Sequence, residues 1–128
     1  MDTALVLFAH GARDEAWAEP FRMLKQSIAK RRPDLMVELA FLESMAPALD
    51  ATLERLAPGH ARIVIAPLFM ARGGHLKQEL PQLLAALRQR HPGCAFDVLR
   101  PVGEVQSVLD AMSDWLCDTV ADDRQPAR

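Results

Sequence analysis

The sequence is poor in aromatic residues and has no tyrosine, so that Phe and Trp together make up only 5% of its 128 residues. A surface that stacks single-stranded nucleic acid depends on such side chains. The charges nearly balance, with 17 Asp and Glu against 15 Lys and Arg, which does not favour a basic nucleic-acid or membrane surface. We therefore expect no nucleic acid and no membrane among the partners of this chain.

Long apolar runs and cysteine pairs are also missing. The first apolar run ends at Ala9 and follows the acidic Asp2, whereas a signal peptide starts with basic residues and a membrane span needs about 20 apolar ones. The two cysteines, Cys94 and Cys117, lack the close spacing of a thiolate metal site and cannot form a disulfide framework. Both lie in apolar segments, so we expect two reduced core residues in a cytoplasmic protein.

The chain alternates apolar runs with stretches of helical periodicity. The runs predict buried strands at residues 3–9, 36–42, 63–68 and 96–99. Between and after them, apolar residues recur at helical spacing; we expect Ser44 to cap the second helix and the third to begin near Pro81. Short loops between such units impose right-handed crossovers between parallel strands. The sequence therefore predicts an α/β fold, a three-layer α/β/α sandwich with a four-stranded parallel sheet, over residues 1–120, with a frayed tail at 121–128.

Three potential metal ligands follow three of these strands. His10 comes directly after the first strand, Glu43 after the second, and His75 lies in the loop after the third. Ligands collect beyond the carboxyl ends of the strands in such sheets. Two imidazoles and a carboxylate suit a divalent ion such as Co²⁺, Fe²⁺, Ni²⁺ or Zn²⁺ and leave coordination positions open.

Each of these residues also fits a purely structural role. Taken alone, His10 reads as a hydrogen-bonded surface histidine, and Glu43 as a carboxylate that stabilises a helix start. The meeting of three separate segments at one rim is what favours a metal site. His60 and His91 fall at the other end of the fold, where we expect solvated side chains.

Glycines and cations surround the candidate ligands. Gly73 and Gly74 would let the backbone approach a large ligand closely, although the pair also fits a plain turn. Arg13, Arg72 and Lys77 could receive carboxylates of an acidic substrate, or could be solvated loop charges.

Three segments in order carry a family resemblance. They read LVLFAHGARD, VELAFLESMAP and IVIAPLFMARGGHLKQELP, and the similarity spans about residues 3–117. The chain resembles the short form of the CbiX-type sirohydrochlorin chelatases, in the class II chelatase superfamily. It departs from the family pattern at Ala12, where serine is usual, and at Glu79-Leu80-Pro81, which replaces an Asp-Ile-Pro triplet.

The resemblance implies a fold, a reaction and an assembly. The fold would be one half of the two-domain class II chelatases, and the reaction would insert Co²⁺, or alternatively Fe²⁺ or Ni²⁺, into sirohydrochlorin without ATP, in cobalamin or siroheme biosynthesis. His10 and His75 match the family's metal-binding and catalytic histidines, and Glu43 matches its acidic partner. The metal is then a substrate, and no permanently bound cofactor is expected. A chain with only one α/β unit would complete its cleft as a homodimer.

Two rival functions belong to other classes. A protein that binds a metal or a tetrapyrrole without catalysing a reaction would have the same fold. Ala12, which stands where the family usually has serine, is compatible with this alternative. A phosphoryl-transfer enzyme with a strand-end histidine usually has an arginine directly before the His-Gly pair, where this chain has Ala9.

Overall fold

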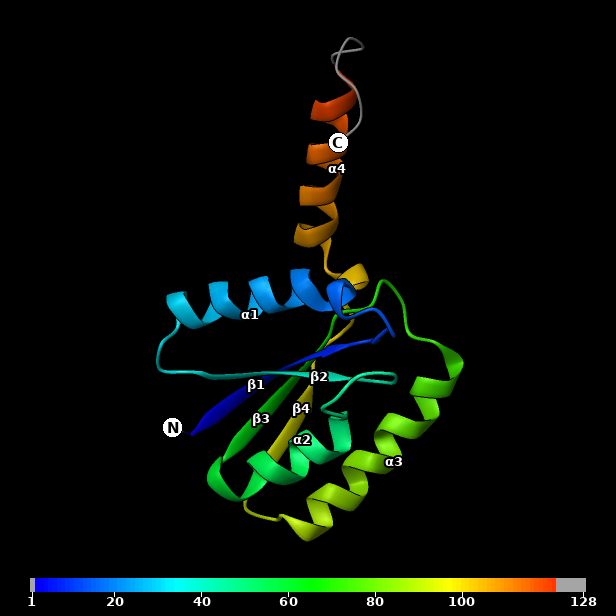
Figure 1. The fold of residues 1–128 in the computed structure, drawn as a ribbon. Coiled ribbons are helices and arrows are strands. Elements are labelled where there is room, and N and C mark those ends of the chain that lie inside the picture. Colours follow the sequence, from blue (N-terminus) through cyan, green and yellow to red (C-terminus); the bar gives the residue numbers. More distant parts are fainter. Residues whose placement is uncertain (1, 122–128) are drawn as a thin grey trace.

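Four parallel strands form the centre of the molecule, in the order β2-β1-β3-β4 (Figure 1). The computed structural model describes residues 2–121. Their strands are β1 (Thr3–Ala9), β2 (Met36–Phe41), β3 (Arg62–Pro67) and β4 (Ala95–Val98). Each lies within two residues of the bounds that the apolar runs predict.

Helices cover both faces of this sheet. The longer ones are α1 (Glu19–Arg31), α2 (Leu49–Leu56), α3 (Gly74–Arg90) and α4 (Gln106–Val120), and the short 3₁₀ turns are η1 (Glu15–Ala18), η2 (Ala57–Gly59) and η3 (Val102–Glu104). Helix α1 packs on one face, and α2 and α3 pack on the other (Figure 1). This arrangement confirms the predicted three-layer α/β/α sandwich.

Alternating residues of β1 supply both halves of the core. Val6 and Phe8 pack beneath α2 and α3, whereas Leu7 and Ala9 pack beneath α1, and all four are buried. A strand that is covered on both faces needs apolar residues at every position, which explains the unbroken run in the sequence. The carboxyl end of this central strand is thereby fixed from both sides.

Two predicted helix starts are wrong. Ser44 does not cap α2; it has a positive φ of 66°, and α2 begins at Leu49 after Ala48. The chain first turns back so that the Phe41 N–H donates to the Pro47 carbonyl at 2.9 Å, which leaves Ser44 in a loop. Helix α3 begins at Gly74, and Pro81 lies inside it. A proline at that position removes one backbone hydrogen bond, which the packing of the Leu76 and Leu84 side chains offsets.

The last helix, α4, rises away from the other layers (Figure 1). It forms where the periodicity predicts it, but none of its residues is buried. The predicted tail at 121–128 lies, apart from Ala121, outside the described residues. Within residues 2–121, no helix combines the length and the apolar character needed to cross a bilayer.

Candidate functional site

His10 and Glu43 lie side by side at the carboxyl edge of the sheet. His10 directly follows β1 and Glu43 follows β2 by two residues. The His10 Nε2 atom lies 3.2 Å from Glu43 Oε1, and the two side chains are 59% and 60% exposed. The structure therefore brings together two of the three predicted ligands and leaves both open to solvent.

Backbone contacts hold these two residues in register. The Leu42 N–H donates to the Ala9 carbonyl at 2.9 Å, and the Glu43 N–H donates to the His10 carbonyl at 3.1 Å. Both bonds extend the β1–β2 pairing past the ends of the strands. The extended strand pairing thus holds the backbones of His10 and Glu43 next to each other.

Gly11 makes this close approach possible. It is buried, its φ is +95°, and a Cβ at this position would lie 1.9 Å from the Glu43 carbonyl oxygen. No other residue type has both the conformational freedom and the absence of a side chain that the position requires. The glycine that follows His10 is therefore needed for the approach of the Glu43 backbone.

Phe69 supports the His10 ring from the β3 side. Its ring meets the Phe8 ring edge-on at a centroid distance of 5.2 Å. It also meets the His10 imidazole at 6.1 Å and an interplanar angle of 80°. Because Phe8 is fully buried, this chain of ring contacts ties the exposed imidazole to the core.

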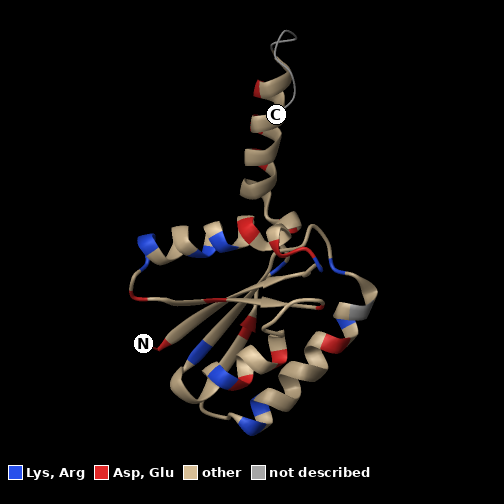
Figure 2. Cartoon of the chain, in the orientation of Figure 1, with Lys and Arg blue, Asp and Glu red and all other residues tan. Residues whose placement is uncertain are grey.

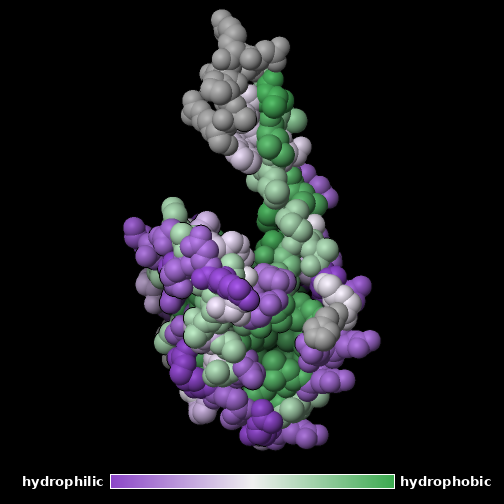
Figure 3. All heavy atoms as spheres, turned by 45° about the vertical axis from the view of Figure 1, so that its right-hand side comes forward, coloured by the Kyte–Doolittle hydropathy of each residue, from purple (hydrophilic) through white to green (hydrophobic). Residues whose placement is uncertain are grey.

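An open, mostly apolar hollow lies beside this pair. Its volume is about 500 Å³, and it is lined by His10, Leu42, Glu43, Phe69, Met70, Ala71, Gly73 and Leu76. Figure 3, which turns this edge of the molecule forward, shows the apolar surface surrounded by hydrophilic residues. A flat apolar ligand could lie here with one face against the wall and its centre near the polar pair.

The third predicted ligand lies on a helix, so its prediction as a loop residue is wrong. His75 is the second residue of α3, directly after Gly74, and its backbone is at the same edge of the sheet. Its side chain lies outside the described part of the structure. Gly73, which precedes α3, lines the hollow, whereas Gly74 does not.

The structure describes two of the three predicted metal-binding side chains, those of His10 and Glu43. Among the side chains that the structure describes, no group of three His, Cys, Asp or Glu residues could hold a metal ion. The geometry of the His10–Glu43 pair suits a metal ion. If each donor atom lies about 2.1 Å from the metal, the 3.2 Å between His10 Nε2 and Glu43 Oε1 corresponds to an angle of about 100° at the metal. That angle falls between octahedral and tetrahedral values, so the His10–Glu43 pair can serve as part of a metal site.

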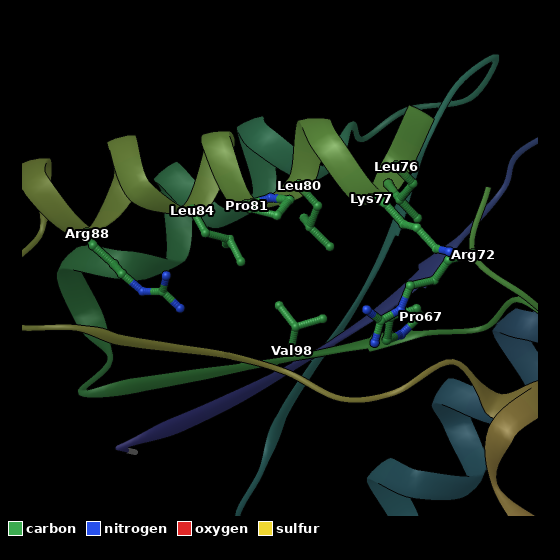
Figure 4. Close-up of a pocket in the computed structure, with 9 residues that line it drawn as sticks. All are labelled: Pro67, Arg72, Leu76, Lys77, Leu80, Pro81, Leu84, Arg88 and Val98. Carbon is green, nitrogen blue, oxygen red and sulfur yellow. The ribbon is translucent and has the colours of Figure 1, made fainter. Parts of the chain in front are cut away.

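The predicted substrate anchors are exposed, and none of them lines the His10 hollow. Arg13 lies on the loop after β1, and Arg72 and Lys77 border a separate hollow of about 250 Å³ beneath α3. Figure 4 shows Arg72 and Lys77 at one end of this second hollow, Arg88 at the other, and apolar side chains between them. None of these cations therefore forms part of the wall of the His10 hollow.

The other two histidines lie at the opposite end of the sheet, as predicted, but they are not simply solvated. The His60 Nδ1 atom is 2.8 Å from the Leu56 carbonyl oxygen, and His91 Nε2 is 3.3 Å from Glu54 Oε2, with only 20% of the His91 side chain exposed. Arg90, through its hydrogen bonds, and His91 hold the pKa of Glu54 below its ordinary value. This cluster joins α2 to the end of α3 and plays no part in the candidate site.

The cysteine prediction is half right. Cys94 is buried, and burial raises the pKa of its thiol. Cys117 is exposed on α4, because that helix does not pack on the core. Neither cysteine lies near His10.

The apolar wall of the site was missed in the sequence. Phe69 and Met70 directly follow the third apolar run, and Leu42 ends the second, so all three read as strand ends or loop residues. The only feature of the sequence that marks these three residues as part of a site is their position between the core of a strand and a candidate ligand. Apolar side chains at the carboxyl edge of a sheet are candidates for a ligand surface, which is how they could have been found.

Comparison with known proteins assigns the chain to a family. A sirohydrochlorin cobaltochelatase of Methanococcus aeolicus is 32% identical over 85 residues, which cover 66% of this chain and 59% of the relative. One from Methanocaldococcus jannaschii is 29% identical over 69% of this chain and 62% of the relative, so the matches span about three fifths of these relatives. A similar protein from Sulfolobus acidocaldarius is 25% identical over 86% of both chains.

Solved structures agree with this assignment. A structure described as a cobalamin (vitamin B12) biosynthesis CbiX protein from Marinobacter aquaeolei has a TM-score of 0.77 at 26% identity, over 93% of this chain and 98% of the other. The sirohydrochlorin chelatase SirB of Bacillus subtilis, in complex with cobalt, shares the fold with a TM-score of 0.69 at 24% identity; the match covers 92% of this chain but 51% of SirB. The CbiX family model matches residues 4–119. The chain therefore belongs to the CbiX family.

Proposed function

We propose that this chain inserts a divalent metal ion, Co²⁺ or alternatively Fe²⁺ or Ni²⁺, into sirohydrochlorin without ATP. The observation that carries the proposal is the pair of exposed donors, His10 Nε2 and Glu43 Oε1, 3.2 Å apart at the mouth of an open apolar hollow. Membership of the CbiX family and similarity to proteins named sirohydrochlorin cobaltochelatase support the same reaction. The reaction would take place in the cytoplasm as a step of cobalamin or siroheme formation.

The metal ion is a substrate in this scheme and no cofactor stays bound. His10 and Glu43 would hold the ion, and His75, from the first turn of α3, would provide the third ligand. A site with open coordination positions can pass its ion on, whereas four protein ligands in a closed shell would retain it. The large exposure of His10 and Glu43 suits a site that must release what it binds.

Insertion also requires proton transfer. Sirohydrochlorin loses two pyrrole N–H protons as the ion loses its water and protein ligands, so that the charge of the M²⁺ ion is balanced by two released protons. Once the ion has left them, the His10 imidazole can accept one of these protons and the Glu43 carboxylate the other. The two residues can thus deliver the metal and take up both protons at one place.

The walls of the site fit a planar, acidic macrocycle. Leu42, Phe69 and Met70 would contact one face of the ring. Arg13, Arg72 and Lys77 would bind carboxylate arms that extend beyond the hollow, because none of the three lines it. One chain covers only one face of the ring and matches about half of SirB, so we propose that a homodimer supplies the second wall.

A spectrophotometric assay tests the reaction. Sirohydrochlorin absorbance is followed with Co²⁺, Fe²⁺ and Ni²⁺ in parallel, without ATP, for the unaltered chain and for His10→Ala, His75→Ala and Glu43→Gln. Loss of a proton acceptor and ligand should slow insertion by about 100-fold or more. The matched control is His60→Ala, whose ring lies at the opposite end of the sheet and should leave the rate unchanged.

The outcomes separate the alternatives. Metal-dependent consumption that fails in the three site variants supports the chelatase. Binding of Co²⁺ or sirohydrochlorin with no turnover would instead identify a non-catalytic binding protein. An unchanged rate in His10→Ala would show that the metal site has been misplaced.

A further inference from the structure

Glu43 lies on a loop that gives its side chain little support. The loop, residues 42–48, joins β2 to α2, and Glu43 is the one charged residue on it (Figure 2). The Glu43 side chain is 60% exposed. With no cation on its own loop and little packing around it, the carboxylate depends on the Glu43 backbone for its place beside His10.

The main chain of Glu43 is held from three directions. Its N–H donates to the His10 carbonyl at 3.1 Å, and its own carbonyl accepts a hydrogen bond from the Met45 N–H at 2.8 Å. Gly11 packs against the same carbonyl, since a Cβ at Gly11 would lie 1.9 Å from the oxygen. Both polar groups of the Glu43 backbone therefore have a partner next to the candidate site.

The hydrogen bond from Met45 to Glu43 closes a three-residue turn with Ser44 at its centre. Ser44 has a φ of 66°. A bond from residue i+2 back to residue i around a positive φ forms the γ-turn that is rare and strained, in contrast to its commoner inverse form. Residues with a Cβ rarely adopt a positive φ, so Ser44 holds this turn at an energetic cost that glycine would avoid and asparagine would reduce.

The residues on either side of the turn explain the strain. Leu42 packs with the core on the α2 and α3 face of the sheet, whereas Met45 packs with the core on the α1 face. The chain therefore crosses the carboxyl edge of the sheet within two residues, Glu43 and Ser44. Because Glu43 is also bonded to β1, the sharp reversal falls on Ser44.

We propose that Ser44 is a positioning residue of the metal site: its strained turn holds the Glu43 backbone where the carboxylate meets the His10 imidazole. Strained residues persist only where the surrounding structure requires them, and they are concentrated at functional sites. A donor that is already in place loses less conformational freedom when it binds, so the metal ion is held more tightly. This role rests on the proposed function, because it assumes that Glu43 binds the metal.

Two substitutions separate the backbone of Ser44 from its hydroxyl. Ser44→Thr keeps the hydroxyl but adds a branch at Cβ, which makes a positive φ still less favourable. Ser44→Asn loses the hydroxyl but suits a positive φ. In titration calorimetry, Ser44→Thr should lower the affinity for Co²⁺ by about 10-fold, whereas Ser44→Asn should largely retain it. Ser27→Thr, at an exposed position of α1, is the matched control and should have no effect.

A double variant shows whether Ser44 acts through Glu43. In a Glu43→Gln chain the carboxylate is already gone, so adding Ser44→Thr should cause little further loss of Co²⁺ affinity. A general disturbance of the loop predicts the same loss in both backgrounds. Circular dichroism checks that each variant keeps its helices.

Hydrogen exchange of the Met45 amide reports the turn directly and without metal. The bond from this amide to the Glu43 carbonyl should slow its exchange in the unaltered chain and in Ser44→Asn. Ser44→Thr should exchange faster at this amide, because its branched side chain opens the turn.

Three results would overturn the role of Ser44 and leave the proposed reaction untouched: full Co²⁺ affinity in Ser44→Thr, a loss that is equally large in the Glu43→Gln background, and a Met45 amide that exchanges as fast in the unaltered chain as in Ser44→Thr. A Glu43→Gln chain with full Co²⁺ affinity would overturn both this role and the proposed metal site. A chain that binds Co²⁺ in the expected pattern but inserts none would contradict the proposed reaction alone.

Discussion

The imidazole of His10 faces the carboxylate of Glu43 across the ends of two hydrogen-bonded strands, with 3.2 Å between Nε2 and Oε1. The Glu43 N–H is bonded to the His10 carbonyl, so backbone and side chains bring the two residues together at the same point. Without a metal, a proton can lie between the two side-chain atoms. A metal ion that binds both donors must displace it.

Metal binding should therefore depend on pH. Imidazole nitrogen binds a metal only when it is unprotonated, so the affinity for Co²⁺ should fall as the pH falls and protons compete for His10. Titration calorimetry from about pH 8 down to about pH 5.5 spans the range in which histidine ordinarily titrates. His10→Ala should weaken binding and flatten the profile. A flat profile for the unaltered chain would point to carboxylate ligands alone.

Gly11→Ala should damage both the fold and the site. The new Cβ would lie 1.9 Å from the Glu43 carbonyl oxygen, at a φ of +95° that alanine rarely adopts. We expect a loss of about 1–3 kcal/mol in the free energy of unfolding, measured with urea, together with weaker Co²⁺ binding. Gly59→Ala is the matched control, since a Cβ there meets nothing within 4 Å. Equal stability of the two variants would show that the β1 and β2 loops can separate without cost.

Phe69→Leu should loosen His10 without unfolding the domain. Leucine keeps most of the apolar surface but loses the edge-on ring contacts with Phe8 and with the His10 imidazole. Aromatic pairs contribute about 0.5–1.5 kcal/mol beyond burial, so stability should fall by that amount and Co²⁺ affinity should fall with it. Met70→Leu, at a neighbouring and largely exposed wall residue, should change neither quantity. A Phe69→Leu variant with full affinity would show that the His10 ring is positioned by the backbone alone.

The fold and two candidate ligands could be predicted because local patterns determine them. The unbroken run of β1 requires cover on both faces, and His10 and Glu43 then fall at the carboxyl edge of the sheet. The loop around Ser44 could not be predicted in the same way. A hydrogen bond from Phe41 to Pro47 reverses the chain there, and the serine, although a good capping residue, ends up with a positive φ.

The position of α4 shows a different limit of sequence patterns. Its apolar residues recur at helical spacing, which predicts a helix with one apolar side, and the helix exists. The pattern does not show which surface covers the apolar side. The direction of α4 depends on the contact of Gly103 with Met70, a residue much earlier in the sequence. The predicted burial of Cys117 was wrong for the same reason.

The two cysteines should differ sharply in reactivity. Cys94 is buried, and the pKa of its thiol is raised, so little thiolate is present at neutral pH. Cys117 is exposed on the polar side of α4. A thiol reagent at pH 7 should modify one cysteine quickly in the folded chain and the second only after unfolding. Cys117→Ser should remove the fast phase; a fast phase that survives it would show that Cys94 is accessible.

The ion pair between α2 and the end of α3 should affect stability in acid. Arg90, which hydrogen-bonds the Glu54 carboxylate, and then His91 hold the pKa of Glu54 below its ordinary value. Since the folded-state pKa is the lower one, the stabilisation is fully present above the ordinary pKa of the glutamate and is lost as the pH falls through the lowered value. Glu54→Gln should therefore reduce the melting temperature at neutral pH, and the difference from the unaltered chain should shrink as the pH falls below about 4.5. Glu104→Gln, which removes an exposed carboxylate on η3, is the control and should give no such convergence. A difference that stays constant down to the most acidic pH at which the chain still folds would show that Glu54 stabilises α2 and α3 by packing and not by its charge.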